Sequence, residues 1–308
     1  MIKHPAFLTR PHYRATHTLP ALRSQAKQQR MAGFYNIATL WLYRCCWQQS
    51  GKLEDYLNYL AFRRDLGYPV STKQQQRIAK WHKNAITRLC WSWLNRSAAH
   101  LRKKLLKVPT QQNELQQELM QAVSEKSAIQ LVGNSANLIN ANLGAMIDRS
   151  PLVLRFNRCF SEETRPEDTG LKTDIWVCAP DFKFGAPKHH WCVLTGPDML
   201  NWLSRLPAAI KKRRDILSVP LSVWRELVRE LAAPPSAGLL TLRFLRQLVP
   251  QCQLYVTGFS LNDAASQYHH ADKNHKAVSR HNWLKEQEIL SRWLALSIIA
   301  LSTEETAN

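Results

Sequence analysis

Residues 127–138 read Ser-Ala-Ile-Gln-Leu-Val-Gly-Asn-Ser-Ala-Asn-Leu, and Val-Leu-Arg-Phe-Asn follows at 153–157. An apolar run ends at Gly133-Asn134-Ser135, a periodic segment covers 138–147, and a second apolar run covers 152–156. This pattern predicts strand, tight turn, helix and strand, which is one βαβ unit. The N–H groups at the start of that helix could hold a phosphate, although the same residues also make ordinary βα turns.

The chain after this unit continues to alternate between strand and helix patterns. The expected strands are 175–178, 191–194 and 253–256, and the expected helices are 114–125, 221–231 and 239–249. This alternation predicts an α/β fold with a mainly parallel, doubly wound sheet. In such a sheet, ligands bind at the carboxyl ends of strands where the order of connection reverses. The turns at Gly133 and Gly258 lie at such ends, and the turn at Ser236 opens a helix.

Positive charge is concentrated in the first third of the chain. The net charge is +19, and residues 1–110 hold 20 Lys or Arg against three acidic residues. Pro109-Thr110 breaks the pattern, so we expect a basic helical accessory region at 1–110 and a second domain at 111–308. Within the basic region, residues 81–107 predict a helix with one apolar stripe and a basic face. That face could be solvated, could contact an anionic membrane or glycolipid, or could meet nucleic acid, for which no recognition motif is present.

Cysteine usage and targeting signals indicate the compartment. The seven cysteines show no C-x-x-C spacing, and residues 1–30 contain no apolar signal segment. We therefore expect a protein of a reducing, cytoplasmic compartment.

Three segments together resemble the sialylmotifs of the eukaryotic-type sialyltransferases, glycosyltransferase family 29. Residues 131–138 with 155–157 resemble the large motif. Residues 235–240 with Gly258-Phe259 resemble the small motif, and His281 and Glu286, spaced H-x-x-x-x-E, resemble the very small motif. The resemblance covers 127–290 and leaves 1–125 outside. Ile129 and Val249 occupy the positions where animal members form a disulfide, and an apolar pair in place of that bridge suits a reducing cytosol. With no Golgi-type anchor apparent either, the chain looks like a bacterial relative, and we expect it to lie peripherally at the inner face of a bacterial cytoplasmic membrane.

The resemblance implies a Rossmann-like sheet of the GT-A variant, a CMP-sugar donor, and inversion at the anomeric carbon without cofactor or metal. It assigns seven residues to donor binding: Gly133, Asn134, Ser135, Asn157, Ser236, Ala237 and Gly238. Ala237 departs from the family because it lacks the hydroxyl of the middle motif position. For the asparagines, turn capping is the structural alternative.

The same resemblance assigns the catalytic histidines. His281 matches the general base, because a histidine can take the proton of the acceptor hydroxyl near neutral pH. Glu286 is expected to orient that segment. Residues 268–272, Tyr-His-His-Ala-Asp, are the candidate for the remaining motif, so His269 or His270 would contact the leaving phosphate. Together with His275 these histidines could suggest a metal, but their spacing is uneven and no D-x-D sequence is present.

The function implied is transfer of sialic acid or Kdo from its CMP ester to a glycan, and the basic region favours a lipopolysaccharide core as acceptor. Two alternatives remain: a non-catalytic glycolipid-binding relative, and a basic nucleic-acid-binding protein.

Overall fold

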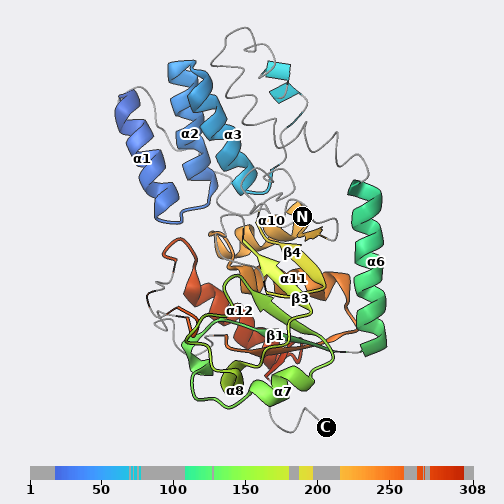
Figure 1. Cartoon of the computed structure of the whole chain (residues 1–308). Coiled ribbons are helices and arrows are strands. Elements are labelled where there is room, and N and C mark those ends of the chain that lie inside the picture. The colour runs from blue at the N-terminus through green and yellow to red at the C-terminus, as the bar shows by residue number, and fades with distance from the viewer. Residues whose placement is uncertain are drawn as a thin grey trace.

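A computed structural model describes residues 18–68, 71, 73–74, 76–77, 108–126, 128–179, 187–196, 216–259, 269–272, 274 and 278–301. In the stretch 108–126, the side chains are described from residue 114 onward. The expected helix at 81–107 lies outside these residues. In Figure 1, the N-terminal helices α1, α2 and α3 lie above an α/β layer structure. The helices are α1 (Leu19–Met31), α2 (Ile37–Ser50), α3 (Leu53–Asp65), α6 (Val108–Lys126), α7 (Gly144–Arg149), α8 (Pro166–Thr169), α10 (Leu221–Leu231), α11 (Ala237–Leu248) and α12 (Trp283–Ala295).

Seven parallel strands form one sheet in the order β5-β4-β3-β2-β1-β6-β7. They are β1 (Ala128–Val132), β2 (Val153–Phe156), β3 (Ile175–Cys178), β4 (Trp191–Leu194), β5 (Ile216–Ser218), β6 (Gln253–Thr257) and β7 (Ala300–Leu301). The predicted α/β class with a mainly parallel sheet is confirmed. The chain runs outward from β1 to β5 and then returns to β6 on the other side of β1, so its winding reverses between β1 and β6.

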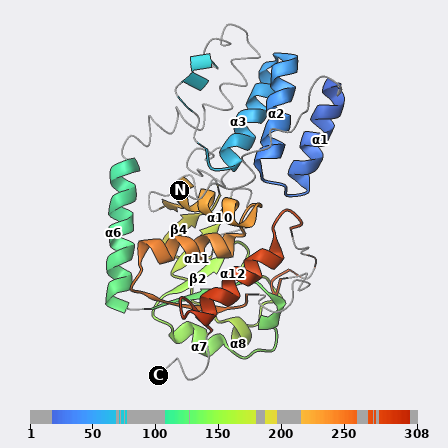
Figure 2. The same cartoon turned by 180° about the vertical axis from the view of Figure 1, so that it is seen from behind.

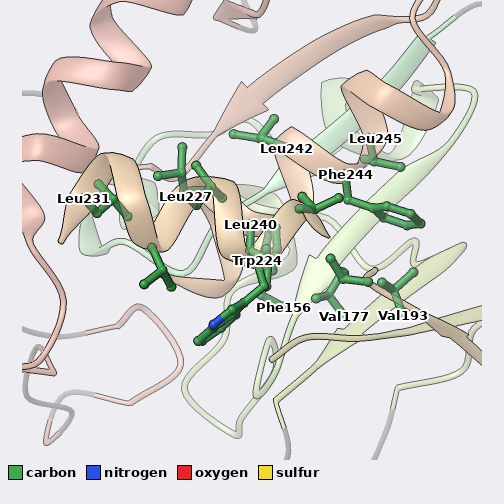
Figure 3. Packing of buried hydrophobic residues seen from close by; sticks show 14 of the residues in the cluster. Phe156, Val177, Val193, Trp224, Leu227, Leu231, Leu240, Leu242, Phe244 and Leu245 are labelled. Atoms are coloured by element: carbon green, nitrogen blue, oxygen red, sulfur yellow. The ribbon is translucent and has the colours of Figure 1, made fainter. Parts of the chain in front are cut away.

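Helices cover both faces of the sheet because alternate strand residues point to opposite sides. On one face, α10 and α11 pack against the strands: Figure 3 shows Leu240 and Phe244 beside Phe156, Val177 and Val193. A smaller cluster covers the other face of β1 and β2. It consists of Val132, Leu138, Met146, Ile147 and Val153.

The expected helix over 138–147 was wrong. The segment forms a short 3-10 helix, η2 (Ala136–Leu138), then a turn, then α7. Asn140 and Asn142 adopt positive φ angles of 61° and 54°, which a right-handed helix does not allow. The Gly-Asn-Ser turn after β1 therefore leads into one turn of 3-10 helix, and not into the longer helix whose N–H groups could have held a phosphate.

The predicted boundary between residues 110 and 111 falls within α6. The division into domains stays a prediction. The N-terminal helices share one apolar cluster with the sheet layer, to which they contribute Leu22, Tyr35, Leu42 and Phe62.

Candidate active site

The carboxyl ends of β1 and β6 form the centre of the candidate site. The Gly133 N–H donates to the Thr257 carbonyl oxygen at 2.7 Å, and the Ser135 N–H donates to the Gly258 carbonyl oxygen at 2.9 Å. A Cβ on Gly133 would lie 2.2 Å from the Gly258 oxygen, so this close approach requires glycine. The two turns expected at the reversal point therefore lie against each other.

The Phe259 ring joins the large and small motif segments. A Cβ on Gly133 would lie 3.1 Å from Cδ2 of Phe259, and a Cβ on Gly238 would lie 2.8 Å from Cε1 of the same ring. Both glycines thus leave room for one aromatic side chain. Ala237, which begins α11, packs beside the main core.

Ser236 and Glu286 connect the small motif to the very small motif. Ser236 caps α11, since its Oγ accepts from the Leu239 N–H at 3.3 Å. Its own N–H donates to Oε1 of Glu286 at 2.7 Å, and its hydroxyl donates to Oε2 at 2.5 Å. Burial raises the pKa of Glu286 to about 7, although both hydrogen bonds act in the opposite direction. The Ser236 hydroxyl, which the family resemblance assigns to binding of the CMP-sugar, is therefore hydrogen-bonded to Glu286 and to the start of α11.

His281 lies just before α12, whose N-cap is Asn282. Nδ1 of His281 is 2.8 Å from the carbonyl oxygen of Pro234. Because a carbonyl oxygen only accepts, Nδ1 carries the proton and Nε2 of the neutral ring is the acceptor. Burial lowers the pKa of His281 to about 4, against the effect of the Pro234 bond, and the charge of Arg280 lowers it further. The ring is neutral at pH 7 and has the tautomer that a general base needs.

His269 and His270 lie along the Gly-Asn-Ser turn. Ser135 and His269 form an antiparallel bridge, and the His270 N–H donates to the Asn134 carbonyl oxygen at 3.0 Å. The His270 side chain is buried, and neither ring nitrogen has a hydrogen-bond partner among the described residues. Burial lowers its pKa to about 4, the charge of Arg155 adds to this shift, and Asp168 opposes it. Tyr268 and His275 lie outside the described residues.

The two motif asparagines both cap strand ends. Nδ2 of Asn134 donates to the carbonyl oxygens of Phe156 at 3.0 Å and Arg158 at 3.3 Å, at the end of β2. Oδ1 of Asn157, whose φ is 45°, accepts from the Ala179 N–H at 2.9 Å after β3. Turn capping, the structural alternative, is therefore present in both. It leaves Oδ1 of Asn134 buried and without a partner among the described residues.

Arg155 belongs to the large motif, and the sequence predicted no role for it. Its side chain is fully buried, and it donates from Nε to the Lys172 carbonyl oxygen at 2.8 Å and from Nη2 to the Thr169 carbonyl oxygen at 2.6 Å. Burial lowers its pKa to about 10. A single charged residue within an apolar strand was the available signal. Arg155 holds the loop after α8 and lies close enough to His270 to influence its charge.

These contacts bring the four motif segments together around Gly133, Phe259, Ser236 and the two histidine segments. A scan against family models matches residues 70–199 to "Glycosyltransferase family 29 (sialyltransferase)". This match supports the predicted resemblance to family 29 and covers 130 of the 308 residues. The match to family 29 supports a CMP-sugar-dependent glycosyltransferase. It begins at residue 70, so the expectation that 1–125 lie outside the resemblance was wrong for 70–125.

Solved structures similar to this chain include two of mammalian sialyltransferases. One is described as the crystal structure of a mammalian sialyltransferase in complex with Gal-beta-1-3GalNAc-ortho-nitrophenol. It shares 20% identity at a TM-score of 0.45 and covers 57% of this chain and 69% of that chain. The other, a mammalian sialyltransferase crystal structure, shares 20% identity at a TM-score of 0.46 and covers 57% of this chain and 68% of that chain. No curated protein matches the chain.

Two further observations concern metals and membranes. Within the described ranges, no group of three His, Cys, Asp or Glu side chains is arranged to hold a metal ion. The expectation of a metal-independent reaction stays a prediction. In the same residues, no helix combines the length and apolar character that crossing a membrane requires.

Proposed function

We propose that this protein is an inverting glycosyltransferase that moves a 2-keto acid sugar from its CMP ester to a glycan hydroxyl, with His281 as general base. The observation that carries the proposal is the fixed tautomer of His281, which lies on one of four motif segments that contact one another. Its Nδ1–H bond to Pro234 directs the lone pair of Nε2 away from the protein carbonyl.

In this mechanism, the acceptor oxygen attacks the anomeric carbon while Nε2 of His281 takes the hydroxyl proton. The bond from the anomeric carbon to the phosphate oxygen breaks on the opposite face, and CMP leaves with the electron pair. A pKa of about 4 makes His281 a weak base in the free protein. The negative charges of a bound CMP-sugar would raise that pKa, because they stabilise the imidazolium ion.

His270 is proposed to donate a hydrogen bond to the leaving phosphate. Its ring is neutral at pH 7 and neither nitrogen has a described partner, so an N–H is available to a ligand oxygen. A donor placed where negative charge develops stabilises the transition state. Asn134, Asn157 and the Ser236–Gly238 turn are proposed to hold the nucleotide, with no metal or cofactor. Because the hydroxyl and the N–H of Ser236 both bond Glu286, that turn would contact cytidine mainly through the backbone of Ala237 and Gly238.

The donor is proposed to be CMP-sialic acid or CMP-Kdo, which share a carboxylate at the anomeric carbon. The proposed acceptor is an anionic lipid-linked glycan such as a lipopolysaccharide core, reached peripherally at a membrane surface. The excess of positive charge in residues 1–110 supports this acceptor, since it would attract an anionic surface.

Titration of the purified protein with CMP, followed by calorimetry, tests the proposal. We expect saturable binding that Asn134→Ala weakens about tenfold, because the unpaired Oδ1 of this buried amide would accept about one hydrogen bond from an N–H or O–H of the nucleotide. Asn58→Ala, the same change at an exposed position of α3, should bind CMP like the wild type.

A screen of CMP-Neu5Ac against CMP-Kdo for hydrolysis and transfer then identifies the donor sugar. Indifference of the wild type to CMP would contradict the transferase. CMP binding without turnover of either donor would favour the non-catalytic relative. Salt-sensitive binding of nucleic acid without CMP binding would favour the nucleic-acid-binding alternative.

A further inference from the structure

The N-terminal helices touch the candidate active site at the residue before its proposed base. Gly33 lies in the turn between α1 and α2, is buried, and has a φ of 84°. A Cβ at this position would lie 2.5 Å from the carbonyl oxygen and 2.8 Å from Cα of Arg280. Figure 2 shows this turn beside the N-terminal end of α12. The backbone that carries His281 is therefore packed directly on the backbone of Gly33.

A second contact joins the same helices to α10. The Trp224 Nε1–H donates to the Asp65 carbonyl oxygen, at the end of α3, at 2.7 Å. Two residues after Asp65, a Cβ on Gly67 would lie 2.4 Å from Cβ of Arg225. The end of α3 thus rests on the first half of α10.

The far end of α10 supports His281. The Leu231 carbonyl oxygen, at the last residue of α10, accepts from Nδ2 of Asn282 at 3.1 Å. The Pro234 carbonyl oxygen accepts from Nδ1 of His281 at 2.8 Å. His281 therefore has two supports, the segment at and after the end of α10 and the Arg280 backbone. The N-terminal helices contact the Arg280 backbone directly and the first half of α10.

The N-terminal helices are themselves tied together near these contacts. Arg30, at the end of α1, forms an ion pair with the buried Asp65 at 2.7 Å. Tyr35 and Phe62 pack with ring centroids 5.3 Å apart. The ion pair and the aromatic pair connect the region of the α1–α2 turn to α3. They fix the position of the Gly33 backbone against Arg280.

From these contacts we propose that Gly33 is a positioning residue for His281: its backbone fixes the 280–282 segment so that Nε2 meets the acceptor hydroxyl. The inference rests on the proposed function, in which His281 is the general base. It also assigns the N-terminal helices a part in the transfer step that is separate from any role of their charge.

Gly33→Ala tests the inference, with Gly51→Ala as a matched control. Gly51 also has a positive φ, 61°, but a Cβ there would have no atom within 4 Å. Both variants carry similar backbone strain, and only Gly33→Ala displaces Arg280. We expect kcat to fall about 100-fold in Gly33→Ala, as a shift of about 1 Å at a catalytic group does. The KM for the CMP-sugar and the Kd for CMP should stay within about twofold of the wild type, since the donor contacts remain.

The His281→Ala background separates positioning from general loss of structure. If Gly33 acts through His281, Gly33→Ala should cause no further loss of kcat in that background. Melting temperatures of Gly33→Ala and Gly51→Ala identify any variant that fails to fold. In that event Gly67→Ala, which loosens the α3–α10 contact, is expected to lower kcat with unchanged donor KM.

The outcomes distinguish this inference from the proposed function. Equal kcat values for Gly33→Ala and Gly51→Ala, or a further loss in the His281→Ala background, would overturn the positioning role while the wild type still transfers. Absence of CMP binding and of transfer in the wild type would instead overturn the proposed function.

Discussion

The two sides of the candidate site hold histidines in contrasting environments: His270 is buried and His281 is half-buried. His281 and His270 each have a pKa lowered to about 4, and burial is the main cause in both. On the His281 side, a backbone carbonyl binds Nδ1 and fixes one tautomer. On the His270 side, both ring nitrogens lack a described partner, and the charge of Arg155 lies nearby. Similar shifts of the pKa therefore accompany an oriented acceptor on one side and uncommitted polar atoms on the other.

This difference indicates a separate role for each histidine. An oriented acceptor is suited to taking a proton, and its role needs little contact with the donor nucleotide. Uncommitted buried nitrogens are costly in the empty protein, so a ligand that bonds to them gains affinity. The two histidines should therefore separate turnover from donor binding when each is replaced.

The largest expected effect is at His281. In His281→Ala, kcat should fall about 1,000-fold, because loss of a general base typically removes a factor of about 100 to 10,000. The Kd for CMP should change less than about twofold, since the ring bonds Pro234 and not the donor. Steady-state transfer assays and calorimetry measure the two quantities. His190→Ala, at an exposed histidine before β4, serves as control. A parallel loss of CMP affinity would place His281 on the donor side.

A smaller effect on turnover is expected at His270, together with an effect on binding. In His270→Ala, kcat should fall about 100-fold and CMP should bind about tenfold more weakly, because one donor to the phosphate is lost. The same assays measure both changes. His270→Asn keeps an N–H donor and should recover part of each loss. If His270→Ala bound CMP like the wild type, the proposed contrast between the two histidines would be wrong.

The smallest effect is expected on stability, at the Ser236–Glu286 contact that joins the small motif to the very small motif. Glu286→Ala should lower the free energy of unfolding by about 3 kcal/mol, because it removes two hydrogen bonds of a buried carboxyl group and leaves the half-buried Ser236 N–H unpaired. Urea unfolding measures this change. Glu288→Ala, at an exposed position on the same helix, should change it little.

The same contact predicts a dependence on pH. The folded protein raises the pKa of Glu286 from 4.5 to about 7. The stability linked to its protonated form is therefore present below pH 4.5 and lost as pH rises through about 7. Between pH 5 and 8, the wild type should lose stability relative to Glu286→Gln, which does not titrate. Glu288→Gln should follow the wild type, and parallel curves for wild type and Glu286→Gln would contradict the raised pKa.

Much of the sheet could be predicted because its signals are local. The apolar runs that form β1, β2, β3, β4 and β6 are dense in branched and aromatic residues, and turn residues bound them. The strands β5 and β7 were not predicted, since three and two residues are too few to show a pattern. The helix over 138–147 was predicted wrongly, because apolar spacing does not reveal that Asn140 and Asn142 adopt positive φ angles.

The candidate site divides in the same way. The order of the motif residues, the glycine turns and the spacing from His281 to Glu286 were determined by the sequence itself, because each is a property of a short stretch of chain. Only the tertiary structure decided that Phe259 joins Gly133 to Gly238, that Glu286 binds Ser236, and that Gly33 supports Arg280. It also decided that both histidines are neutral at pH 7. Burial and partner geometry arise when distant segments exclude water together, and no local pattern encodes them.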